Sequence, residues 1–276
     1  MRRIQTVELF LPLQHELVSL LRGLGESEWS RPTLARGWAV KDVAAHLLDT
    51  DLRRLSSLRD GHAPAPPAED VGDYRGLVAF LNRMNASWVG AARRLSPRVL
   101  VDLLEWSGPQ VAGLFASLPP DGPARIPVAW AGEERSANWM DTGREYTEKW
   151  HHQAQIREAV GAPALNSRRW LAPVIELSMY ALPHAFRDAD APAGSALGVC
   201  IEGEAGGVWH IVREAGAWSL REGEASGAAA SVRTDADTAW RLFFNALGRE
   251  EAGRRVASEG DERLCDVFLG VRSVMV

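Results

Sequence analysis

The sequence contains little cysteine, no long apolar run and no excess of positive charge. Its two cysteines, Cys200 and Cys265, lie far apart among 276 residues, which excludes a disulfide framework and is typical of buried thiols in a reducing compartment. No apolar stretch approaches the roughly 20 residues of a membrane-spanning helix. The N-terminal apolar run is interrupted at Pro12, too early for a signal peptide. We therefore expect a cytoplasmic protein that contacts no membrane.

The charge balance of the chain is mildly acidic. The formal net charge is −5, and no basic run interleaved with aromatic residues occurs, so the sequence predicts no nucleic-acid partner. With 46% apolar residues, the chain can bury one large core or two modest ones, and two is the better expectation at this length. Gly161 and Pro163 separate two regions of different character. We place the domain boundary there, with domains at residues 1–162 and 163–276.

The first region is predicted to be entirely helical. Apolar residues recur at three- and four-residue spacing, as in the helices of a bundle. Capping residues, glycines and prolines separate segments at residues 6–24, 40–58, 73–95, 97–118 and 138–161. Pro12 must lie near the first turn of its helix or kink it. Residues 61–72, which include Ala-Pro-Ala-Pro-Pro, predict a loop, either a mobile one over a site or a plain connector.

The second region is predicted to be α+β. A helix is expected at residues 167–187. From residue 197 the period of the apolar residues changes to two, which predicts strands at 197–201, 208–212, 218–220 and 230–232. We expect an antiparallel meander with helices packed on one face. Thr234 and Asp237 form a capping-box pattern that predicts a following helix, and a last helix begins near Asp261.

The helix predicted at residues 138–161 carries a polar stripe. At about 100° per residue, one narrow face holds Asp141, Arg144, Glu148, His152, Gln155 and Ala159. The other side carries aromatic residues that are poor candidates for a solvated surface: Trp139, Tyr146 and Trp150. We infer that the polar stripe points inward. A buried carboxylate and imidazole must then be paired or bound to a metal, because leaving them bare costs several kcal/mol.

Glu148 and His152 are the candidate metal ligands of this stripe. They lie four residues apart, so their side chains are one helical turn apart and can share one ion. The alternative is a solvated Glu/His pair on a helix surface. His151 also lies within one turn of Glu148, and spacing alone does not exclude it as the ligand. His46 lies at the edge of the apolar stripe of its helix, where it could reach a cleft or be a satisfied boundary histidine.

Two segments together carry a family resemblance. The first is Trp38-Ala-Val-Lys-Asp-Val-Ala-Ala-His46-Leu, and the second is Arg144-Glu-Tyr-Thr-Glu148-Lys-Trp-His-His152-Gln-Ala-Gln155. The pair resembles the mycothiol-dependent maleylpyruvate isomerase family, a branch of the DinB-like bundles. The resemblance implies a DinB-like four-helix bundle, followed at residues 163–276 by a small sterol-carrier-like domain. It also implies that His46, Glu148 and His152 hold a divalent metal, usually zinc, and that His151 does not.

The function that the resemblance implies depends on a low-molecular-weight thiol, mycothiol or a similar one. Three protein ligands leave a fourth position open, as in catalytic zinc sites, and zinc lowers the pKa of a thiol bound there enough to deprotonate it. In the family the thiolate adds to an activated double bond of a small electrophilic substrate, rotation follows and the thiol is expelled; relatives could instead transfer the thiol to an electrophile. Arg144 and Gln155, one turn on either side of the ligands, are our candidates for catalytic or substrate-contacting groups. Many relatives have Asp at the position of Gln155.

Other readings of the sequence stay open. The chain could be a non-catalytic, metal-bound ligand-binding or stress-response protein whose C-terminal sheet holds an apolar ligand. The polar stripe could also be purely structural, in which case no metal binds. Within the resemblance, the family's C-terminal catalytic arginine has three candidates: Arg213, Arg221 and Arg233.

Overall fold

The computed structural model describes residues 2–62 and 73–275, so the loop predicted at 61–72 lies almost entirely outside the described residues. The chain divides into two compact units. The helical unit comprises Thr6–Pro120 and Glu148–Ala164, and the sheet unit comprises the residues up to Gln5, Asp121–Thr147 and the residues from Leu165 onward. Each unit is therefore built from segments that are not consecutive in the sequence. The prediction that the chain folds as two independent domains with a boundary at residues 162–163 stays a prediction.

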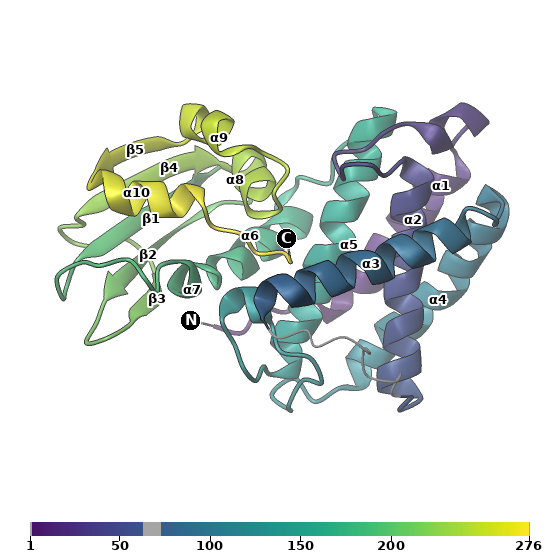
Figure 1. Cartoon of the computed structure of the whole chain (residues 1–276), viewed down its shortest axis with the longest axis horizontal. Coiled ribbons are helices and arrows are strands. Elements are labelled where there is room, and N and C mark those ends of the chain that lie inside the picture. Colours follow the sequence, from purple (N-terminus) through teal and green to yellow (C-terminus); the bar gives the residue numbers. More distant parts are fainter. Residues whose placement is uncertain (1, 63–72, 276) are drawn as a thin grey trace. The chain divides into compact units, whose positions relative to one another are not determined.

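The helical unit is built from helices whose ends follow local chemistry. It contains α1 (Phe10–Arg22), α2 (Val40–Arg54), α3 (Tyr74–Ala92), α4 (Pro97–Ser117) and the C-terminal part of α5 (Asn138–Val160) (Figure 1). Asp73 and Ser96 cap α3 and α4, each accepting a backbone N–H of the first turn at 2.8 and 3.3 Å. Pro12 lies in the first turn of α1, as predicted. Within the described part of the chain, no helix is both long and apolar enough to cross a bilayer.

The core of the helical unit lies around α2. Helix α2 packs against α3 and α4, and α1 packs against α4. Val43 and Leu47 of α2 are fully buried, as are Leu100 and Leu104 of α4 and Ile156 of α5. Each such side chain contributes about 1.5–3 kcal/mol through removal from water. The predicted bundle periodicity is thus realised as one shared apolar core.

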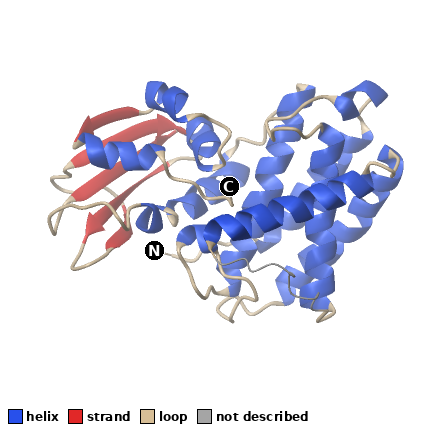
Figure 2. Cartoon of the chain, viewed as in Figure 1, coloured by secondary structure: helices blue, strands red, loops and turns tan. Residues whose placement is uncertain are grey.

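The sheet unit confirms the α+β class. Its helices in this part of the chain are α6 (Arg168–Met179), α7 (Leu182–Ala185), α8 (Ala236–Phe243), α9 (Arg249–Arg255) and α10 (Glu262–Leu269). Its strands are β1 (Ala196–Glu202), β2 (Gly207–Arg213), β3 (Trp218–Glu222), β4 (Ala230–Asp235) and β5 (Ala257–Gly260). They form one sheet, drawn in red in Figure 2, in the order β3-β2-β1-β4-β5 that is labelled in Figure 1. Helices α8 and α10 lie against β4, and α7 lies against β3.

The sheet is mixed, which corrects the prediction of an antiparallel sheet. The pairs β1/β2, β2/β3 and β4/β5 are antiparallel, but β1 and β4 run parallel, with Val199 beside Val232. After the β1-β2-β3 meander the chain returns to the free edge of β1 rather than continuing beyond β3. The apolar alternation of β4 identifies its buried face but carries no information about its neighbour or direction.

Two further local predictions need correction. Helix α8 is capped by Asp235, which accepts the Thr238 N–H at 2.9 Å, and not by Thr234, because strand β4 extends through residue 235 and pairs Thr234 with β1. The helix predicted at 167–187 is interrupted after Met179, and α7 begins with Pro183 in its first turn. Proline has no N–H to continue the helical hydrogen bonds, which explains the break.

Helix α5 is buried on almost every side. Tyr146 and Trp150 are buried, and so are Asp141 and Gln155 of the polar stripe, at 3% and 5% exposure. His152 of the stripe is also buried, whereas Arg144 and Glu148 are partly exposed. The inference that the stripe points inward is therefore confirmed for Asp141, His152 and Gln155. Buried polar side chains on a helix of this kind need defined partners.

Candidate metal centre

Helix α2 places His46 in the interior of the helical unit. The helix begins at Val40, where Asp42 accepts the Ala39 backbone N–H at 3.1 Å and also pairs with Arg93. This capping interaction fixes the start of the helix. His46 follows one turn after Asp42 and is only 4% exposed. Its side chain thus leaves α2 on a face that is closed to bulk water.

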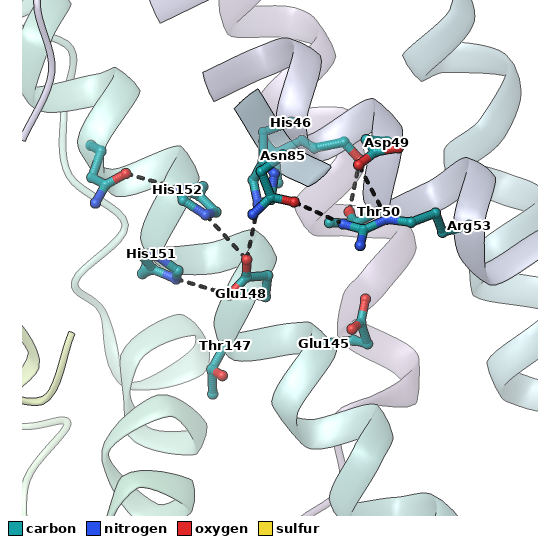
Figure 3. A network of polar contacts seen from close by, with 12 residues as sticks. His46, Asp49, Thr50, Arg53, Asn85, Glu145, Thr147, Glu148, His151 and His152 are labelled. Atoms are coloured by element: carbon teal, nitrogen blue, oxygen red, sulfur yellow. Dashed lines mark hydrogen bonds and ion pairs between the residues drawn. The ribbon is translucent and has the colours of Figure 1, made fainter. Parts of the chain in front are cut away.

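Helix α5 brings two donors to the same place. Glu148 Oε1 lies 3.1 Å from His46 Nε2 and 3.2 Å from His152 Nε2 (Figure 3). One ligand atom from each of the three residues lies within 4.8 Å of the others. His46 is 102 residues distant from Glu148 in sequence. The fold therefore collects in the helical unit the three residues that the resemblance implies as ligands.

The two imidazole rings are held in different ways. His152 Nδ1 lies 2.9 Å from Gln155 Oε1, so this amide oxygen accepts the Nδ1–H and orients the ring. His46 Nδ1 is buried without a hydrogen-bond partner among the described residues. Its ring instead packs on Trp38, with centroids 5.0 Å apart, and Trp38 also stacks near His152 at 6.3 Å. Trp38 thus forms an aromatic wall beside both rings.

The electrostatics of the cluster favour an ionised carboxylate. Burial lowers the pKa of His46, and the hydrogen bond with Glu148 offsets this only in part. Burial would raise the pKa of Glu148, but the His152 charge and the hydrogen bonds from His152 and His46 outweigh it and hold this pKa well below its usual range. The surroundings therefore favour the carboxylate form of Glu148 and the neutral form of His46. These are the forms in which the two side chains bind metals.

His151 lies close to the cluster but on a different side of the carboxylate. Its Nδ1 is 3.9 Å from Glu148 Oε2, whereas the two Nε2 atoms lie near Oε1 (Figure 3). Its ring centroid is 4.0 Å from that of His152. Among the described residues, the group whose donor atoms converge contains His46 and His152 but not His151.

The two candidate catalytic residues have different surroundings. Gln155 touches a member of the cluster through His152. Arg144 lies one turn before Glu148 on α5 and pairs with Asp141 at 2.7 Å and Glu145 at 2.9 Å. Their catalytic roles stay predictions.

The three arginine candidates belong to the sheet unit. Arg221 pairs with Glu214, and Arg233 pairs with Glu202 at 3.2 Å. The Arg213 guanidinium carbon lies 6.0 Å from the centre of the Trp218 ring. No contact among these distinguishes one of them as catalytic.

A polar group on α2 and α3 was missed by the sequence analysis. Arg53 Nε lies 3.1 Å from Asp49 Oδ2, and Arg53 Nη2 donates to Asn85 Oδ1 at 3.5 Å. Burial raises the pKa of Asp49, although Arg53 opposes this. Asp49 and Arg53 follow His46 at intervals of three and seven residues, a helical spacing that could have revealed the shared face.

The donor set is suited to a divalent metal. Two imidazoles and one carboxylate form the three-protein-ligand arrangement of catalytic zinc sites, which leaves a coordination position for water or substrate. The two imidazole Nε2 atoms approach one carboxylate oxygen, and Gln155 contacts the other nitrogen of the His152 ring. Such support orients metal-binding histidines and is part of a functioning site.

A helical unit with a convergent His/Glu/His cluster, joined to an α+β sheet unit, defines the class of this protein. The family model described as the mycothiol maleylpyruvate isomerase N-terminal domain matches residues 10–157. The match covers more than half of the chain, and the chain belongs to this family. It includes all three residues of the cluster. A comparison with curated proteins gives no match.

Solved structures agree on the fold. The crystal structure of the mycothiol-dependent maleylpyruvate isomerase is 13% identical, with a TM-score of 0.55, and the alignment covers 94% of this chain and 96% of that chain. A histidine-to-alanine mutant of that isomerase gives a TM-score of 0.52 over the same shares at 13% identity. At this identity the likeness establishes the fold alone.

A third solved structure, a UbiJ-SCP2 ubiquinone synthesis protein, is 15% identical and covers 35% of this chain and 93% of that chain, with a TM-score of 0.26. A score this low supports no argument. The sterol-carrier-like character of the C-terminal part therefore stays a prediction.

Proposed function

We propose that the protein is a divalent-metal-dependent enzyme that uses a low-molecular-weight thiol as a nucleophile on a small electrophilic substrate. His46, Glu148 and His152 are its metal ligands, and zinc is the expected metal. The observation that supports this most directly is the convergence of three donor atoms within 4.8 Å. Membership of the mycothiol maleylpyruvate isomerase family supports the thiol. The reaction is an isomerisation or a transfer of the thiol.

The chain's own residues prepare this site. When bound, zinc would lower the pKa of a thiol at the open position, so that the thiol is a nucleophile at neutral pH. Gln155 holds the His152 ring with Nε2 directed at Glu148. Trp38 limits the water that reaches the two imidazoles, since its ring lies near both. Low water content strengthens charge interactions inside the site.

The test combines metal content with thiol-dependent turnover. Purified protein should contain about one equivalent of zinc or a similar ion, and Glu148→Ala should contain little. With mycothiol and maleylpyruvate, the zinc-loaded protein should convert the substrate only when both the thiol and the metal are present. Metal-free wild-type protein that takes up no ion on titration would refute the metal site.

The same assay separates the enzyme from the non-catalytic alternative. A protein that binds zinc but shows no turnover with mycothiol and either maleylpyruvate or a general thiol acceptor would contradict the enzymatic proposal. It would favour a metal-bound binding protein. A thiol that coordinates the metal releases a proton, so proton release on adding mycothiol is a second, independent measurement.

A further inference from the structure

A buried ion pair and a hydrogen bond to its carboxylate join helices α2, α4 and α5. Asp51 of α2 is completely buried, and its Oδ1 contacts the Nζ of Lys149 of α5. Its Oδ2 accepts a hydrogen bond from Ser107 Oγ of α4 at 2.7 Å. Ser107 is also completely buried, and Lys149 is 6% exposed. One carboxylate thus has a partner on each of two other helices.

Stability alone is a weak explanation for this group. Desolvating a carboxylate and an ammonium is costly, and well-packed apolar side chains of similar volume often stabilise a core equally well or better. Lysine is also rare in this chain: Lys149 and the surface-facing Lys41 are its only two. The better-attested benefit of a buried polar group is a unique arrangement of its helices.

The ion pair is placed where it can fix the arrangement of α2 and α5. Lys149 directly follows Glu148, about 100° further around α5, and Asp51 follows His46 by five residues, about 140° further around α2. Two sets of side-chain contacts therefore connect α2 and α5, the His/Glu/His cluster and the Asp51–Lys149 ion pair, and they leave each helix in different directions around its axis. Together the two sets oppose both rotation and sliding of one helix against the other.

Metal coordination needs this accuracy. Metal–ligand distances must hold to about 0.2 Å, and a functional group must be held to within about 0.5 Å and 10–20°. A small rotation of α5 would move Glu148 and His152 together away from His46. We propose that Asp51, Lys149 and Ser107 are positioning residues that hold α5 and α2 in the register at which His46, Glu148 and His152 bind one metal ion. This rests on the proposed function.

The test separates positioning from stability. The double variant Asp51→Leu/Lys149→Met replaces the ion pair by apolar side chains of similar size. We expect its urea midpoint, measured without metal, to equal or exceed that of the wild type. Its Kd for Zn²⁺, measured by competition with a chromophoric chelator, should rise about 10-fold or more. The visible spectrum of bound Co²⁺ should also change, since it reports ligand geometry.

Ser107→Ala is the second variant, because it keeps the ion pair and removes one hydrogen bond; we expect its Kd for Zn²⁺ to rise by roughly 3- to 10-fold. Glu16→Gln is the matched control. It weakens the pair between Glu16 and Arg157, which joins α1 to α5 at 2.8 Å without involving α2. Zinc affinity should then stay within about twofold of the wild type.

The outcomes distinguish this inference from the proposed function. Failure of the wild type to bind Zn²⁺ would overturn the proposed function and, with it, this role. If the wild type binds, a folded double variant with an unchanged Kd and Co²⁺ spectrum would overturn the positioning role alone. Should the double variant not fold, Ser107→Ala decides: a weaker affinity at unchanged secondary structure supports the role, and an unchanged affinity overturns it.

Discussion

Replacing His46 and His151 separately by alanine gives the sharpest test of the ligand set. His46 Nε2 is 3.1 Å from the shared carboxylate oxygen, whereas His151 approaches the other oxygen at 3.9 Å. Four-ligand zinc sites in small peptides bind with about 10–16 kcal/mol, which is roughly 2.5–4 kcal/mol per ligand. His46→Ala should therefore raise the Kd for zinc on the order of 10² to 10³, while His151→Ala should change it by less than about threefold.

The assay is zinc competition with a chromophoric chelator at neutral pH, together with metal content after dialysis. Both histidines are buried, at 4% and 3% exposure, so both variants lose packing, and far-UV circular dichroism and urea unfolding show whether each remains folded. This makes His151→Ala a fair control for the loss of a buried imidazole. Full metal content in a folded His46→Ala protein, or its loss in a folded His151→Ala protein, would refute the assignment.

Gln155→Ala should weaken zinc binding about 10- to 100-fold, because it removes the 2.9 Å contact with His152 Nδ1. Gln155→Glu keeps an acceptor and should bind zinc at least as tightly as the wild type. Equal zinc affinities in the wild type and both variants would count against a supporting role of Gln155. Asp235→Ala should lower the unfolding free energy by about 1 kcal/mol at pH 7 through loss of the α8 cap. Burial alone would raise the pKa of Asp235, but hydrogen bonds from the first turn of α8 outweigh burial and hold this pKa below its ordinary value. The contribution of Asp235 to stability is therefore complete above about pH 4 and is lost as the pH falls through the depressed pKa. In urea unfolding from pH 7 to 2.5, the difference in unfolding free energy between wild type and Asp235→Ala should shrink. A difference that grows on acidification would contradict the cap. Tyr146→Phe should cost about 1–2 kcal/mol, since the buried hydroxyl donates to the Trp170 carbonyl at 2.7 Å; a change below about 0.5 kcal/mol in thermal or urea unfolding would show that the carbonyl finds another donor.

Much of the secondary structure could be predicted from local chemistry. The ends of α3 and α4 follow from the capping side chains of Asp73 and Ser96, and four strands follow from apolar alternation. Strand β5 could not be predicted in this way, because all four of its residues are exposed and it has no alternation. The parallel pairing of β1 with β4 depends on which edges meet in space. Local sequence patterns do not encode that choice.

The candidate site could be predicted only in part. Glu148 and His152 share one face of one helix, so their spacing was informative. His46 was identified through the family resemblance, because a single histidine at the edge of an apolar stripe has no partner visible in sequence. Asp51 did leave a signal: it falls on the apolar face of α2, between Leu47 and Leu55, where a buried charge requires a partner. That the partner is Lys149 depends on the packing of α2 with α5.

The separation of the donors along the chain has a consequence for folding. His46 and Glu148 are 102 residues apart, so an unfolded chain does not present the three donors together. A metal ion held as proposed would therefore bind the folded helical unit in preference to the unfolded chain. It would stabilise the folded state by linking His46 to Glu148 and His152 across the segment between them. By mass action it would stabilise that unit by about 2.7 kcal/mol at a free concentration 100 times its Kd. The free metal concentration would then affect the resistance of the helical unit to proteolysis, independently of any catalytic activity.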